Sequence, residues 1–136
     1  MDTTRRAPTT PGTGRFDRFA SQWAIQLISF RRNGKPVETP VNIAVDEGRA
    51  FFRTFEESGK FKRLRRNPLV RIRPSTWLGR PTGPAEDARA ELLEGDAAER
   101  AAALIDAKHP LFQRVLVRLG HRLRGLHTRH FELIPR

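Results

Sequence analysis

A short segment near the middle of the chain combines the residue types that hold a phosphate group. An apolar run is followed by Ser58, Gly59 and Lys60, and a strongly basic stretch then leads to Pro68. The Ser58 hydroxyl can cap a helix, which leaves backbone N–H groups facing outward beside the positive end of the helix dipole. Gly59 lets a ligand approach the backbone closely, and Lys60 and Lys62 add ammonium charge. The segment predicts a phosphate-binding turn.

The same pattern also suits a solvated basic surface helix with an ordinary serine cap, because a cap does not require a ligand. In either case Asn67-Pro68 should end the helix, since proline disfavours the α conformation in the residue before it. The residues alone leave both interpretations open.

Composition and charge narrow the classes of function. The 136 residues suit one domain, and 26 lysines and arginines against 15 acids give a net charge of +11. An anionic partner is therefore expected: phosphate groups, a polycarboxylate tail, nucleic acid or an acidic membrane surface. With no cysteine, the chain cannot form disulfides or thiolate metal sites. No apolar run approaches the roughly 20 residues of a membrane helix, and no signal peptide is evident, so a soluble cytoplasmic protein is expected.

The elements that must position this turn are mainly strands. Residues 1–14, rich in Thr, Pro, Arg and Gly, predict a flexible tail, and 15–136 a single domain. Asn33-Gly34 predicts a hairpin turn, and Asp96 with Glu99 resembles a capping box for a helix at 97–108. Further helices are expected at 15–22 and 111–124, and 86–94 suits a strand or, by propensity, a helix. The expected strands are 24–31, 35–46, 49–54, 69–77, 86–94 and 128–134, which predict a mainly β, α+β domain: a six-stranded antiparallel barrel.

Four motifs occur in register and carry a family resemblance: Gly34–Val41, Arg53-Thr54, Ser58–Pro68 and Gly79–Pro84. In this order they resemble the deazaflavin-dependent branch of the pyridoxamine 5'-phosphate oxidase-like proteins, which have the FMN-binding split β-barrel fold. The likeness extends over residues 16–95 and is looser towards the C-terminus.

The resemblance implies a homodimer of split barrels with a cofactor at each side of the subunit interface. The flat ring of the cofactor would lie against the strand that contains Thr39, Pro40 and Val41, and its phosphate would be held by the strand end and turn that follow. The cofactor-binding residues implied in this way are Thr39, Pro40, Val41, Arg53, Thr54, Ser58, Gly59, Lys60, Lys62 and Trp77.

Coenzyme F420 suits the charge of this region better than FMN, because its phosphodiester is followed by several glutamates. The cations beside the turn are Lys60, Lys62, Arg63, Arg65 and Arg66. Two features depart from this scheme. Glu56 and Glu57 would repel a phosphate unless their side chains point into solvent, and Asn42 stands where relatives often have an aromatic residue.

The function implied is hydride transfer between the reduced deazaflavin and a small organic acceptor, with the cofactor carrying out the difficult step. No catalytic side chain or proton donor can be assigned. The alternatives are an FMN-binding oxidoreductase of the same fold, a non-catalytic cofactor carrier, and a basic barrel that stacks nucleic-acid bases on Phe51, Phe52, Phe55 and Phe61. His121, His127 and His130 lack a carboxylate or cysteine partner at a useful spacing, so no metal site is expected.

Overall fold

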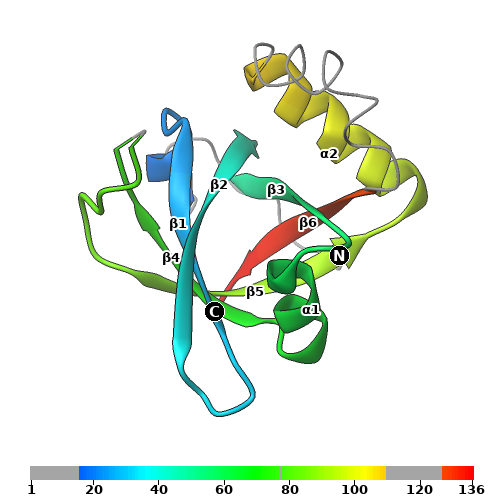
Figure 1. Cartoon of the computed structure of the whole chain (residues 1–136). Helices are drawn as coiled ribbons and strands as arrows, with labels where there is room; N and C mark the ends of the chain where they lie inside the picture. Colours follow the sequence, from blue (N-terminus) through cyan, green and yellow to red (C-terminus); the bar gives the residue numbers. More distant parts are fainter. Residues whose placement is uncertain (1–15, 77, 110–126) are drawn as a thin grey trace, which may run out of the picture.

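The computed structural model describes residues 16–76, 78–109 and 127–136, whose strands close into a barrel (Figure 1). All neighbouring strands are antiparallel, in the order β1-β2-β3-β6-β5-β4, with β4 pairing back onto β1. The predicted mainly β, α+β fold with a six-stranded antiparallel split barrel is confirmed. The strands are β1 (Ala24–Phe30), β2 (Pro36–Asp46), β3 (Arg49–Phe55), β4 (Leu69–Pro74), β5 (Glu86–Leu93) and β6 (Thr128–Pro135).

Tight turns set the register of the first three strands. Gly34 has φ 85°, in the β1–β2 turn, and Glu47 and Gly48 have φ 51° and 78°, in the β2–β3 turn. In the β2–β3 turn both central residues have positive φ, which is typical of the type I′ hairpin, whose twist matches that of the strands. The last strand, β6, then lies between β3 and β5, which closes the barrel.

Two α-helices, α1 (Gly59–Arg66) and α2 (Gly95–Lys108), and a short 3-10 helix, η1 (Asp17–Phe19), accompany the barrel within the described residues. The predicted helix after Ser58 and the strand at 86–94 are confirmed. The capping box is wrong: α2 begins at Gly95 and its cap, Glu94, makes no side-chain bond. Gly95 has φ 60°, so the chain turns from β5 into the helix one residue before Asp96. The predicted tail at 1–14 and helix at 111–124 lie outside the described residues.

Strand β3 separates two hydrophobic clusters. On its inner face Phe52 stacks against Phe131 of β6, with ring centroids 5.2 Å apart and planes 8° from parallel. On its outer face Phe51 packs against α2 through Ala101 and Ile105. Because side chains alternate along a strand, this one segment both fills the barrel and holds α2 against it.

Replacing Phe131 by alanine should destabilise the barrel strongly, because the ring is fully buried (1% exposed) and its removal loses apolar burial and leaves a cavity. The expected loss is about 3–5 kcal/mol in the free energy of unfolding, measured by urea titration. As a control, Arg89→Ala should change stability by no more than about 0.5 kcal/mol, because its pair with Glu91 is solvent-exposed. Equal effects of the two changes would contradict the assignment of Phe131 to the core.

Candidate functional site

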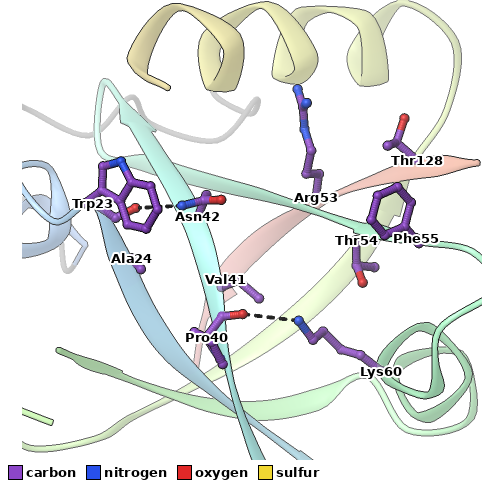
Figure 2. A pocket seen from close by; sticks show the side chains of 10 residues that line it. All are labelled: Trp23, Ala24, Pro40, Val41, Asn42, Arg53, Thr54, Phe55, Lys60 and Thr128. Atoms are coloured by element: carbon purple, nitrogen blue, oxygen red, sulfur yellow. Dashed lines mark hydrogen bonds between the residues drawn. The ribbon is translucent and has the colours of Figure 1, made fainter. Parts of the chain in front are cut away.

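A cavity of about 310 Å³ lies where β1, β2, β3 and β6 meet the first turn of α1 (Figure 2). Its size is at the lower end of the range for small-molecule sites, which are mostly apolar with a few placed polar groups. The wall follows that pattern. The lining residues are Trp23, Ala24, Pro40, Val41, Asn42, Arg53, Thr54, Phe55, Lys60 and Thr128.

Lys60 brings an ammonium group into this cavity without a counter-charge. Its Nζ donates a hydrogen bond to the carbonyl oxygen of Pro40 at 3.3 Å, and it makes no salt bridge with any described residue (Figure 2). Burial, with a smaller effect from the nearby Arg63 guanidinium, lowers the pKa of Lys60 from 10.5 to about 8. An anion in the cavity would restore the missing counter-charge.

The serine predicted as the helix cap has that role. The Ser58 hydroxyl accepts a hydrogen bond from the backbone N–H of Phe61 at 3.1 Å and donates one to the carbonyl of Phe55 at 2.7 Å. Thr54 Oγ1 lies 3.2 Å from the same oxygen. Ser58 therefore fixes the turn and orients Thr54 at the cavity wall.

Arg53 is directed towards α2 and away from that turn (Figure 2). It donates to Asp106 Oδ1 at 2.7 Å and to the carbonyl oxygen of Ala102 at 3.3 Å. Its side chain is only 10% exposed, and its Nε is buried without a hydrogen-bond partner. Arg53 thus contributes a mostly neutralised charge and one unused donor.

The structure brings together only part of the predicted set. Thr39 is not among the lining residues, and its Oγ1 is buried without a hydrogen-bond partner. Gly59 and Lys62 face a different pocket, while Trp77 lies outside the described residues. The predicted residues that do line the cavity are Pro40, Val41, Arg53, Thr54 and Lys60.

The pocket that Gly59 and Lys62 line is open and about 420 Å³ in volume, and it lies between the β1–β2 turn and α1. We call it the basic pocket; its lining residues are Arg31, Arg32, Asn33, Gly59, Lys62, Arg63 and Arg66. None of its five cations pairs with an acid in the described part of the chain. Burial and the neighbouring guanidinium groups of Arg31 and Arg66 lower the pKa of Arg63. Uncompensated charge of this density favours a polyanion.

Sequence reasoning missed several lining residues, of which Trp23 is the largest. Trp23 is 50% exposed, and its ring meets that of His109 edge-on at 5.7 Å between centroids. Asn42 donates to the carbonyl oxygen of Trp23 at 3.3 Å. Thr128 lines the cavity because it pairs with Phe55, which also lines it, across β3 and β6. No local pattern marks that pairing, since the two residues are far apart in the sequence.

The two acids before the cap are tied to the start of β6. Glu56 pairs with Arg129 at 2.9 Å, and Glu57 lies 2.8 Å from His127 Nδ1 and accepts from the His127 backbone N–H at 2.9 Å. The hydrogen bonds between them lower the pKa of Glu57 and raise that of His127. These partners offset the repulsion that the two carboxylates would exert on an anion near the turn.

Two classes of site find no support in the described ranges. No group of three or more His, Cys, Asp or Glu side chains there could hold a metal ion. No helix among the described residues is long and apolar enough to cross a membrane.

Comparison with known proteins identifies the fold. No protein-family model matches the chain, and no curated protein is similar to it. A pyridoxamine 5'-phosphate oxidase candidate from Listeria innocua has 15% identity and a TM-score of 0.55, with 84% of each chain covered. The heme storage protein HutZ from Vibrio cholerae has 18% identity and a TM-score of 0.61, with 85% of this chain and 83% of HutZ covered. A FAD-binding protein from Mesorhizobium loti has 17% identity and a TM-score of 0.52, with 86% and 82% covered.

These identities are low, so the likeness establishes the split-barrel fold alone. The fold implied by the resemblance in the sequence is confirmed. Proteins of this fold are described as binding different groups, and the choice of ligand must come from the residues of the site.

Replacing His130 by leucine should flatten the pH dependence of stability between about pH 4 and 6.5. Burial, together with the nearby charge of Arg53, lowers the pKa of His130 from 6.5 to about 4. In that window the unfolded chain binds more protons than the folded one, so stability falls as the pH is lowered, by up to about 3 kcal/mol. Urea titrations at several pH values would measure the slope.

The control is His127→Gln, which removes an exposed histidine whose pKa is raised by Glu57. The stabilisation by this group is fully present below about pH 6.5 and is lost only as the pH rises through its folded pKa, so the variant should keep the wild-type slope between pH 4 and 6.5. His109, whose pKa burial also lowers, should leave a residual slope in His130→Leu. An unchanged slope in His130→Leu would contradict the prediction.

Proposed function

We propose that this chain is an oxidoreductase of the split-barrel type that binds coenzyme F420 and transfers a hydride between it and a small organic acceptor. The observation that carries the proposal is the position of α1 between two complementary sites. Lys60 on this helix lines the mostly apolar cavity, and Gly59 and Lys62 line the basic pocket. One extended ligand with a flat ring, a phosphate and an anionic tail would use both.

The residues present fit such a group. The ring would meet the apolar wall formed by Pro40, Val41 and Trp23, and a phosphate would receive the ammonium of Lys60. Lys60 has no counter-ion among the described residues, so its ammonium group is available to an anion in the cavity. Charge-assisted hydrogen bonds of this kind are among the stronger polar contacts in proteins.

The basic pocket favours F420 over FMN. FMN ends at its phosphate, whereas the tail of F420 continues with glutamate carboxylates that could reach Arg31, Arg32 and Lys62. Unpaired surface cations repel one another, so a polycarboxylate tail would gain binding energy there that FMN cannot. FMN binding to the same cavity stands as the alternative.

A heme in this cavity is less well supported. Heme iron is held by histidine, cysteine, methionine or tyrosine. The chain has no cysteine or tyrosine and a single methionine, Met1. No histidine lines the cavity in the described part of the chain.

The nucleic-acid alternative required an open aromatic groove. Phe51 and Phe52 are buried, at 6% and 0% exposed, and Phe61 packs against the barrel core. Of the four phenylalanines, Phe55 lines the cavity instead. These rings do not form a stacking platform on the described surface.

When bound, the deazaflavin would supply the hydride chemistry. The chain would orient the ring through the β2 wall, hold the phosphate with Lys60, and exclude water with Trp23 and Phe55. A cofactor carrier without turnover would use the same contacts, so only an electron acceptor can separate carrier from enzyme.

We also propose that the protein forms the homodimer that the family resemblance implies. Trp23 and Leu78 are the large apolar side chains exposed in the described residues, at 50% and 79%. Ser75 donates to the carbonyl oxygen of Ala24, and Gln26 to that of Gly79, so the loop that carries Leu78 is held against the start of β1, the strand that follows Trp23. We propose that this apolar face joins two copies and covers the cavity mouth.

Light scattering during gel filtration should give twice the chain mass of 15.6 kDa. The change Leu78→Glu should shift the protein towards the single-chain mass, because it places a charge in an apolar contact. Arg89→Glu, an exposed change on β5, is the control and should leave the mass unchanged. A wild-type mass of one chain at micromolar concentration would contradict the proposed dimer.

Replacing Lys60 by alanine should weaken F420 binding by at least about tenfold, because one charge-assisted contact to the phosphate is lost. Titration of the protein, followed by cofactor fluorescence at two salt concentrations, would measure the affinity. Arg89→Ala, which also removes one positive charge, should leave binding unchanged. Wild-type affinity in Lys60→Ala would remove Lys60 from the site.

The double change Arg31→Ala and Arg32→Ala separates the two cofactors. It should weaken F420 binding and reduce its salt dependence, with little effect on FMN. Saturable F420 binding followed by reduction of an added electron acceptor would support the enzyme. Binding of neither cofactor, with salt-dependent retention of nucleic acid, would overturn the proposed function.

A further inference from the structure

Lys60 differs in its surroundings from the other lysines of the chain, of which there are three: Lys35, Lys62 and Lys108. Lys35 and Lys62 are exposed. Lys108 Nζ is buried without a hydrogen-bond partner, so solvent and reagents do not reach it. Lys60 alone is partly buried and at the same time lines a cavity open to small molecules.

Burial and the absence of an acid beside Lys60 Nζ favour a neutral amine. Its one hydrogen bond within the described residues goes to the Pro40 carbonyl, and the nearby charge that affects it is the guanidinium of Arg63. Lys60 is also in the first turn of α1, where the positive end of the helix dipole disfavours a cation. The Pro40 carbonyl oxygen holds the side chain in place but adds no full negative charge beside Nζ.

The consequence is a large population of unprotonated amine near neutral pH. With its pKa at about 8 in place of 10.5, about a quarter of Lys60 is neutral at pH 7.5, against about one in a thousand for an ordinary lysine. Desolvated lysines beside another cation are the ones that proteins use as amine nucleophiles.

We propose that Lys60 is an imine-forming amine and that the cavity accepts small uncharged aldehydes, preferably aromatic ones. The neutral Nζ attacks the carbonyl carbon with its lone pair and forms a C–N bond, while the carbonyl oxygen takes a proton and becomes a hydroxyl. Loss of that hydroxyl with the remaining N–H proton as one water molecule leaves the imine. The step needs no oxidant or reductant.

The cavity wall sets the class of aldehyde. Trp23, Val41 and Phe55 offer apolar and aromatic surface beside Lys60, which suits a planar apolar ring. Arg53, the other cation of the lining, is paired with Asp106. An aldehyde therefore needs no anionic group to be held there.

This activity is independent of the proposed cofactor, although the two share Lys60. An anionic cofactor phosphate beside Nζ would stabilise the ammonium form and so suppress imine formation. Bound cofactor should therefore protect Lys60, and the apo protein should react.

The experiment treats the apo protein with benzaldehyde and sodium cyanoborohydride, which reduces any imine to a stable benzylamine, and maps the label by peptide mass spectrometry. Lys60 should be labelled at least about tenfold faster than Lys62, its neighbour on α1. The rate at Lys60 should level off above about pH 8, while that at Lys35 and Lys62 continues to rise. The α-amino group, with an ordinary pKa near 8, is an internal reference.

Lys60→Arg keeps the positive charge and should lose the selective label, while Lys62→Arg should retain it. The pH profile of the wild-type protein tests the proposal even if Lys60→Arg does not fold. Equal labelling of Lys60 and Lys62, or a Lys60 rate that rises through pH 10, would overturn it. Selective labelling without protection by F420 or FMN would support the imine site and count against the proposed cofactor, so the two proposals can fail separately.

Discussion

Strand β3 is covered on both faces, and this double burial ties the barrel, the second helix and the cavity together. Phe52 points inward to stack on β6, and Phe51 points outward against α2. Arg53, two residues further on the same side as Phe51, must then meet α2 as well, where Asp106 receives its charge. The cavity begins where the strand ends, at Thr54 and Phe55.

The distribution of charge follows from the same packing. Several arginines on the barrel surface form ion pairs with acids, for example Arg49 with Glu132 and Arg73 with Glu38. Among the described residues, a group of cations without acidic partners remains on the two sides of α1, in the basic pocket and at Lys60. Binding chemistry is expected where charge is left uncompensated.

Most of the fold could be predicted from the sequence, because it depends on local signals. Alternating side chains, the Asn33-Gly34 turn and the Ser58 cap each act over a few residues, and all three recur in the structure. The site was predicted in part. A single stretch after β3 was expected to hold one phosphate group, yet the first turn of α1 sends Lys60 to one side and Gly59 and Lys62 to another. Sequence spacing does not show which way each side chain of a capped turn points.

The sequence by itself determined the strands, the capped helix, the excess of positive charge and the absence of thiol chemistry, because these depend on neighbouring residues or on composition. Only the tertiary structure decided that Trp23 and Thr128 share a cavity with Lys60, and that Arg53 is neutralised by Asp106. Such contacts join strands and helices distant in the chain. They exist only once the barrel has closed, since its register, not the local sequence, brings those side chains together.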